Sequence, residues 1–146
     1  MSEVVVDTTV LRKADVHLKP AKERGALLAK RIGVLERINR NELAVLISAR
    51  LIAEYASQVS LGKNDVVKLF LELLTKPDGT NCISNWPAWR GAERDLMTRC
   101  RFPPEDVHVL RTAYRNKPTF ILTEEGRMLT KDECVYRRFR VHIQRP

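Results

Sequence analysis

The sequence contains few cysteines and no long apolar run, and each shortage excludes a class of protein. Three cysteines among 146 residues, Cys82, Cys100 and Cys134, cannot form a fully paired disulfide framework. No apolar run approaches the roughly 20 residues that cross a membrane. The N-terminus also lacks the apolar core and small-residue cleavage site of a secretory leader. We therefore expect a cytoplasmic chain that keeps its thiols reduced and binds no membrane.

The short motifs that carry well-known catalytic chemistry are also missing. The chain has no glycine-rich phosphate loop, no serine-nucleophile elbow and no zinc-protease helix motif. His17, His108 and His142 are isolated, with no cysteine or second histidine at zinc-ligand spacing, so we interpret them as surface histidines. Glu124 and Glu125 are adjacent rather than spaced as an acid and a base, and we interpret them as solvated turn charges. We expect no enzyme activity, no cofactor and no metal.

Positive charge is what the sequence has in excess. Lysine and arginine outnumber aspartate and glutamate by 26 to 18, which gives a net charge of +8. This balance favours an anionic partner, and double-stranded DNA is the first candidate. Residues 134–146 contain arginines but no acid, and the guanidinium fork suits phosphate oxygens and guanine edges. The candidate DNA-binding residues are Arg94, Arg99, Arg101, Arg111, Arg115, Arg137, Arg138 and Arg140.

Both tryptophans of the chain, Trp86 and Trp89, lie in one predicted loop around Pro87. Tryptophans in such a loop either stack on the bases of a bound nucleic acid or fill a core or an interface. The sequence leaves both interpretations open.

Apolar spacing predicts a mainly α-helical fold with a short, β-rich and basic C-terminal segment. We expect an irregular or short β lead-in over residues 1–20, a helical domain over 21–116 and a strand-like segment over 117–146. Within the helical domain, we expect helices over 21–40, 42–60, 65–75, 91–99 and 104–114. After it, we expect strands over 119–123, 127–129 and 135–143.

The predicted helix over 42–60 has an apolar face wider than one helix–helix contact requires. A helix with such a face packs on more than one neighbour, so we expect an oligomer. The candidate residues of a dimer or partner interface are Leu43, Leu46, Ile47, Leu51, Tyr55, Leu69, Phe70, Leu73 and Cys100.

Five short runs follow one another along the chain: Glu36-Arg37-Ile38-Asn39, Leu46-Ile47-Ser48-Ala49-Arg50-Leu51-Ile52, Leu61-Gly62, Leu73-Leu74-Thr75 and Cys100-Arg101-Phe102. Together they resemble the FlhD family of transcriptional activator subunits. Their order and the spacing from Leu-Gly to Leu-Thr are similar to those of the family.

The resemblance implies a function. FlhD-like chains form helical homodimers that join an FlhC-like subunit on double-stranded DNA and switch on an operon, here of the conjugative-transfer or flagellar type. RNA polymerase is a further candidate partner. FlhC-type subunits carry the zinc site, so none is expected in this chain. The family cysteine that matches Cys100 lies near the dimer interface and can bridge two chains.

Two alternatives remain open. One is a homodimeric ribbon-helix-helix DNA-binding regulator, in which residues 30–38 form the ribbon strand. The other is a protein adaptor that does not touch DNA and whose positive charge serves an acidic partner.

Overall fold

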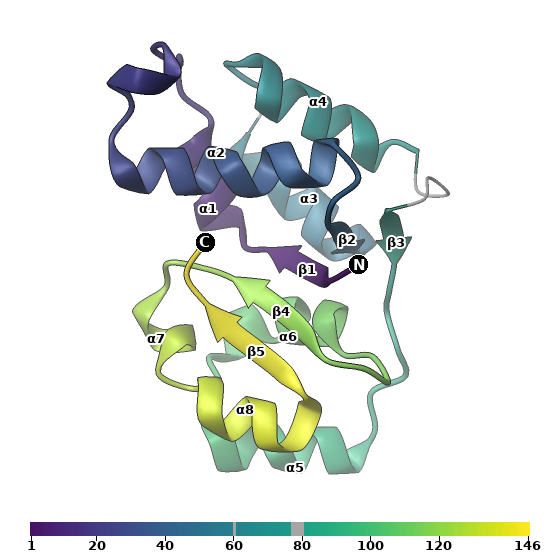
Figure 1. Ribbon diagram of the computed structural model, residues 1–146. Coiled ribbons are helices and arrows are strands. Elements are labelled where there is room, and N and C mark those ends of the chain that lie inside the picture. The colour runs from purple at the N-terminus through teal and green to yellow at the C-terminus, as the bar shows by residue number, and fades with distance from the viewer. Residues whose placement is uncertain (60, 77–80) are drawn as a thin grey trace.

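Short apolar runs of this chain form the strands of one parallel sheet. A computed structural model describes residues 1–59, 61–76 and 81–146, without the side chains of residues 92, 96 and 97. It contains a five-stranded sheet of order β3-β2-β1-β4-β5, with every neighbouring pair parallel (Figure 1). The strands are β1 (Glu3–Val6), β2 (Ala44–Ile47), β3 (Cys82–Ser84), β4 (Thr119–Leu122) and β5 (Val141–Gln144).

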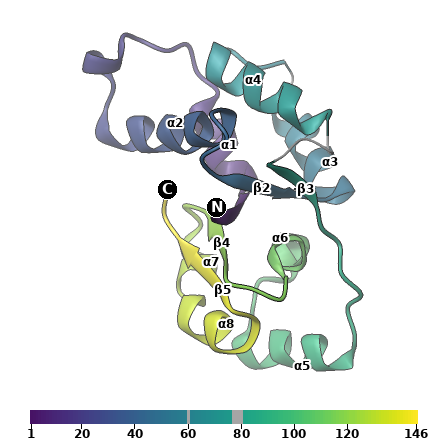
Figure 2. The same ribbon diagram turned by 45° about the vertical axis from the view of Figure 1, so that its right-hand side comes forward.

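Helices connect the strands and cover the sheet. Those before β3 are α1 (Thr8–Ala14), α2 (Ala26–Asn39), α3 (Ala49–Gln58) and α4 (Asp65–Leu74), with a 3-10 turn, η1, over Ala21–Glu23. Those after β3 are α5 (Gly91–Cys100), η2 (Pro104–Asp106), α6 (Val107–Ala113), α7 (Gly126–Leu129) and α8 (Asp132–Phe139). Figure 2 shows α1 to α4 gathered at one end of the molecule and α5, α6 and α8 at the other.

This architecture corrects the predicted fold class. The protein is an α/β fold built on a parallel sheet, so the expectation of a mainly α-helical, FlhD-like helical dimer is wrong. The sheet takes strands from all three predicted segments, 1–20, 21–116 and 117–146. Residues 30–38, the ribbon strand of the alternative interpretation, lie inside helix α2.

The largest local error lies in the predicted helix over 42–60. Its first part is strand β2, which is buried along its whole length. Strands of a parallel sheet are covered on both faces, so they appear in sequence as continuous apolar runs without alternation. Ser48 then begins α3, because its side chain accepts a hydrogen bond from the Leu51 N–H.

The C-terminal segment is less strand-rich than predicted. Residues 127–129 belong to α7 and most of 135–143 belongs to α8, whereas only the last part forms β5. Arg140 separates the two elements in the left-handed conformation, with φ of 58°. Residues 8–10, β-branched and expected to be extended, form the start of α1.

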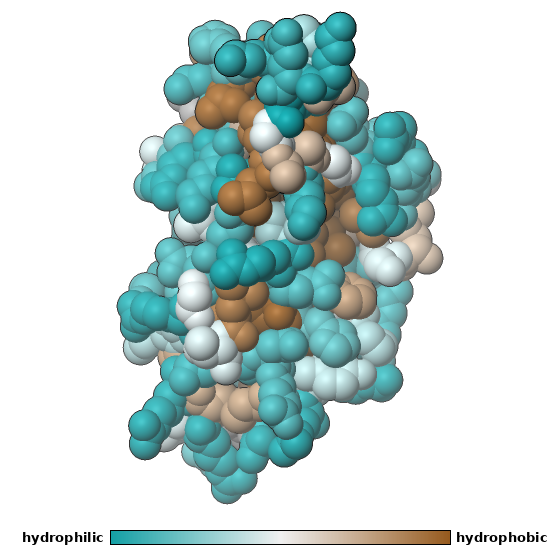
Figure 3. Space-filling view, turned by 60° about the vertical axis from the view of Figure 1, so that its left-hand side comes forward, coloured by the Kyte–Doolittle hydropathy of each residue, from teal (hydrophilic) through white to brown (hydrophobic). Residues whose placement is uncertain are grey.

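Most of the predicted interface residues form the core of the chain itself. Leu43, Leu46, Ile47, Leu51, Tyr55 and Phe70 are all buried in the monomer, and Leu73 packs partly against the same core. Only Leu69 is openly exposed. Side chains buried within one chain cannot also face a sister chain. The face seen in Figure 3 has hydrophobic side chains along its middle, surrounded by hydrophilic ones.

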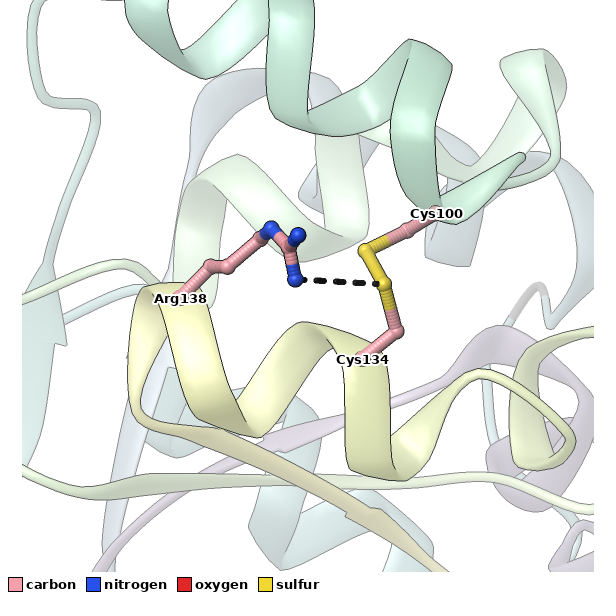
Figure 4. The surroundings of a disulfide bond; sticks show 3 residues. All are labelled: Cys100, Cys134 and Arg138. Carbon is pink, nitrogen blue, oxygen red and sulfur yellow. Dashed lines mark hydrogen bonds between the residues drawn. A yellow bond between two sulfur atoms is a disulfide. The ribbon is translucent and has the colours of Figure 1, made fainter.

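Two of the three cysteines form an intrachain bond. Cys100 at the end of α5 is bonded to Cys134 in α8, which corrects the expectation of reduced thiols and of Cys100 at a dimer interface (Figure 4). Cys82 in β3 is a buried free thiol. The bond joins two segments 34 residues apart in sequence.

In the described part of the chain, no helix combines the length and the apolar character that crossing a membrane would require.

Candidate functional site

The sheet has a reversal in its connections between β1 and β4. From β1 the chain builds β2 and β3 on one side and then returns to place β4 and β5 on the other. The segments that leave the carboxyl ends of β1 and β4 therefore diverge and leave a crevice between them. Ligands of open parallel sheets bind at such a crevice.

Four carboxylates line a pocket at this crevice. Asp7 follows β1, Glu54 lies in α3, Asp106 precedes α6 and Glu125 precedes α7. The pocket has a volume of about 220 Å³, and its remaining lining residues are Thr8, Thr9, Arg12 and Gln58. We call these eight residues the carboxylate pocket.

Hydrogen bonds of both its backbone and its side chain hold Asp7 in place. Its backbone N–H donates to the carbonyl of Leu122, which continues the pairing of β1 with β4 beyond the strands. The hydroxyls of Thr9 and Thr123 donate to Oδ2 of Asp7 at 2.8 and 2.7 Å. Burial raises the pKa of Asp7 and outweighs the two hydroxyls, which lower it, and the nearby charge of Glu54 raises it further.

Glu54 is held from two directions. The Thr8 hydroxyl donates to Oε1 at 2.5 Å, and Nε2 of His108 lies 2.6 Å from Oε2. His108 is 5% exposed, and its buried Nδ1 has no hydrogen-bond partner among the residues that the structure describes. The expectation that His108 is a surface histidine is therefore wrong, because α6 turns its ring inward towards α3.

The pKa of Asp106 is raised within the carboxylate pocket. Burial and the charges of Asp7, Glu105, Glu125 and Glu54 raise its pKa to about 6. Burial is the largest of these causes, and repulsion by the neighbouring acids adds to it. Near-neutral pKa values of this origin are typical of functional sites.

The adjacent pair Glu124 and Glu125 divides into two roles. Glu124 forms a two-pronged ion pair with Arg31 of α2, with both distances 2.6 Å, and these hydrogen bonds lower the pKa of its carboxyl. Glu125 instead lines the carboxylate pocket. The interpretation as a solvated turn charge is therefore wrong for Glu124, whereas Glu125 is half-buried beside the turn that precedes α7.

The carboxylate pocket offers oxygen atoms that a cation could bind, although it does not surround a cation with protein ligands. Across the described parts of the chain, no three histidine, cysteine or acidic side chains already stand close enough to hold a metal ion. However, each oxygen of Glu54 accepts one hydrogen bond and keeps a second lone-pair site, and both hydroxyl donors of Asp7 go to Oδ2. Mg²⁺ needs only one or two carboxylates together with waters and substrate phosphates.

The predicted DNA-binding arginines do not form one surface. Arg115 pairs with Glu3 at 2.7 Å, at the amino end of β1 and therefore at the opposite edge of the sheet from Asp7. Arg111 donates to the Pro87 carbonyl and lies over the Trp86 ring at 4.1 Å. These two arginines support the structure of the chain itself.

The remaining arginines lie on α5 and α8 or directly after them. Arg137 pairs with Glu133, Arg138 approaches the sulfur of Cys134 at 3.9 Å (Figure 4), and Arg140 ends α8. Arg94, Arg99 and Arg101 are exposed, and two of them, Arg94 and Arg101, line one hollow beside α5.

Sequence reasoning missed all four pocket acids. A signal existed for two of them: Asp7 directly follows the apolar run of residues 4–6, and Glu125 closely follows the apolar run of residues 119–122. Acids directly after buried parallel strands meet at one edge of a sheet. Glu54 and Asp106 carry no such signal, because their placement depends on how α3 and α6 pack.

A scan against protein-family models, a search of curated proteins and a search of solved structures each returned no match to this chain.

Proposed function

We propose that this protein hydrolyses phosphodiester bonds of nucleic acid with the help of divalent cations bound at the carboxylate pocket. The observation that carries the proposal is the convergence of Asp7, Glu54, Asp106 and Glu125 on one pocket at the reversal point of the sheet. This assignment departs from the expectation of no enzyme activity and no metal.

The chemistry of the ligands favours a hard cation. Carboxylate and hydroxyl oxygens are what the pocket offers, and Mg²⁺ and Mn²⁺ prefer such ligands. A cation there would lower the pKa of a bound water and offset charge on a phosphoryl oxygen. Asp7 and Glu54 are the residues we expect to hold it, because hydroxyls and His108 fix their orientation.

The charge of the chain favours a polyanionic substrate. A phosphate approaching four carboxylates without a cation would be repelled, whereas the net charge of +8 attracts a nucleic acid to the molecule as a whole. In the reaction, a water oxygen adds to phosphorus and the water gives up one proton. The bond from phosphorus to the leaving sugar oxygen breaks, and that oxygen takes up one proton.

The test is cleavage of labelled single-stranded and duplex RNA and DNA with Mg²⁺, with Mn²⁺ and with EDTA. We expect cleavage that needs the cation and is at least about a hundredfold slower in Asp7→Asn and Glu54→Gln. Glu72→Gln is the matched control, because Glu72 is an exposed carboxylate on α4 that does not line the pocket. Cleavage that EDTA leaves intact, or that all three variants retain, would overturn the proposal.

DNA binding without cleavage is the second candidate function. The exposed arginines Arg94, Arg99 and Arg101 favour it. The FlhD-like activator acting with an FlhC-like partner stays a prediction of this kind, although its helical-dimer premise is lost. Salt-dependent DNA binding with no cleavage under any cation would favour this candidate.

A further inference from the structure

A second hollow lies next to the carboxylate pocket. It has a volume of about 430 Å³, within the roughly 300–1,000 Å³ of small-ligand sites. Its described lining residues, which we call the α5 hollow, are Trp89, Arg94, Thr98, Arg101, Phe102, Pro104 and Val107. Apolar walls, two cations and no acid make up this lining.

Trp89 gives the α5 hollow a fixed aromatic wall. Its ring stacks on Phe139 with centroids 5.7 Å apart and an interplanar angle of 3°, and it meets the edge of Tyr114 at 5.7 Å. Trp89 is nevertheless only partly buried. A ring that is held in place and still reachable suits stacking on a nucleobase, because little conformational freedom is lost on binding.

The two cations of the α5 hollow are not engaged elsewhere. Within the described residues, neither the Arg94 nor the Arg101 guanidinium has an ion pair or hydrogen bond, unlike Arg115 and Arg111. Arg101 is the first residue after α5 and has φ of 52°, a conformation that favours glycine. Both guanidiniums are therefore free to bind phosphates.

The α5 hollow and the carboxylate pocket share one turn of backbone. Pro104 and Val107 line the α5 hollow, whereas Asp106, between them in sequence, lines the carboxylate pocket. Consecutive Cα atoms lie about 3.8 Å apart, so the two linings adjoin through this turn. A base can enter the hollow only when it is not paired and stacked in a duplex.

We propose that the α5 hollow takes an unpaired base of the single-stranded nucleic acid whose backbone enters the carboxylate pocket, with Arg94 and Arg101 binding phosphates beside that base. The assignment rests on the proposed function and adds the substrate class: single strands in preference to duplexes. Under this assignment, both interpretations of the tryptophan loop apply to Trp89. One side of its ring packs against an aromatic core, and another side lines the hollow where a base would stack.

The experiment uses Trp89 as its own reporter. In Trp86→Phe, Trp89 is the single tryptophan of the chain. Its fluorescence is titrated with Ca²⁺ in place of Mg²⁺, because Ca²⁺ takes the same oxygen ligands and offsets the charge of the carboxylates. The probes are a short oligothymidylate, the oligouridylate of equal length, an abasic strand of equal length and a duplex. We expect quenching and tighter binding with either base-bearing strand, by about tenfold over the abasic strand and the duplex.

Variants separate the hollow from general charge. Thr98→Phe should fill the hollow and weaken oligothymidylate binding about tenfold, because one stacked base is lost. The pair Arg94→Gln and Arg101→Gly should also weaken binding and flatten its salt dependence. Lys22→Gln with Lys30→Gln removes equal charge from exposed residues that do not line the hollow and should retain the quenching.

Two results would overturn the assignment. One is no quenching by any strand. The other is an affinity that changes neither when the abasic strand replaces oligothymidylate nor when Thr98→Phe replaces the parent. Its failure differs from failure of the proposed function. Cation-dependent cleavage without quenching removes the base site alone, whereas quenching by single strands without cleavage under Mg²⁺ or Mn²⁺ removes the hydrolysis alone.

Discussion

Nε2 of His108 lies 2.6 Å from Oε2 of Glu54, which joins a buried ring of α6 to a pocket acid of α3. The ring is in no position to touch a substrate, because His108 is 5% exposed and does not line the carboxylate pocket. We expect its hydrogen bond to Oε2 to fix the orientation of the Glu54 carboxylate. Residues that orient metal ligands in this way affect binding almost as strongly as the ligands themselves.

Replacing His108 should therefore weaken cation binding more than it weakens the fold. We expect His108→Ala to raise the Mg²⁺ concentration for half-maximal cleavage by about 10- to 100-fold. His108→Gln can still donate to Glu54 and should recover part of the effect. The measurement is the Mg²⁺ dependence of cleavage beside the melting temperature. Equal Mg²⁺ dependence in both variants and the parent would contradict the positioning role.

The raised pKa of Asp106 predicts a pH-dependent change in stability. Its carboxyl has a pKa of about 6 in the fold, against 3.8 as the ordinary value. The charged form is thus disfavoured by folding. This cost is fully present above about pH 6 and disappears below pH 3.8, where the folded and unfolded chains are both protonated.

Asp106→Asn should remove that cost. In metal-free buffer at pH 7.5 we expect the variant to be more stable than the parent by about 1–3 kcal/mol, with the difference vanishing near pH 4. Denaturant unfolding at both pH values measures it. Added Mg²⁺ should stabilise the parent more than the variant, since the variant has one negative charge fewer at the pocket. A variant less stable at pH 7.5 would contradict the repulsion described for the pocket.

The Cys100–Cys134 bond predicts sensitivity to reductant. Closing a loop of 34 residues lowers the entropy of the unfolded chain, an effect worth about 4 kcal/mol in the chain-entropy model. We expect dithiothreitol to lower the melting temperature of the parent but not of Cys134→Ser. Cys82→Ala, which removes the buried free thiol, is the control and should keep the reductant effect. A parent whose melting temperature ignores reductant would contradict the bond.

Two neighbouring residues of α4 test the fold against the predicted interface. Phe70 is fully buried and meets Tyr55 edge-on at 6.2 Å, whereas Leu69 is 54% exposed. We expect Phe70→Ala to lower the free energy of unfolding by about 3–5 kcal/mol and Leu69→Ala to change it by less than about 0.5 kcal/mol. Both losses should be independent of protein concentration. Concentration-dependent stability that Leu69→Ala abolishes would instead restore an interface at α4.

The sequence predicts the elements with strong local signals. Helices α2, α4 and α5 were predicted within a few residues, because their apolar positions recur at helical spacing. In α4, Asn64 also accepts a hydrogen bond from the Val67 N–H, as an N-cap residue should. Strand β4 is predicted from its apolar run, and β1 lies within residues 1–20, which are expected to be irregular or to hold a short β segment.

The rest of the fold depends on long-range packing. The run before Ser48 is equally compatible with a buried strand and with a helix, and only its pairing with β1 and β3 decides. The same holds for the site. Glu54 and Asp106 come together from segments 52 residues apart because α3 and α6 pack near each other, and no local pattern records that contact.

Direct Mn²⁺ binding tests most simply whether the carboxylate pocket binds a cation. Calorimetric titration of the metal-free protein should show binding in the parent and in Glu72→Gln, and at least about tenfold weaker binding in Asp7→Asn and Glu54→Gln. Binding should also weaken in the parent as pH falls through about 6, where Asp106 takes up a proton. A parent that binds no Mn²⁺ at pH 7.5, or that binds it equally in all variants, would contradict the account.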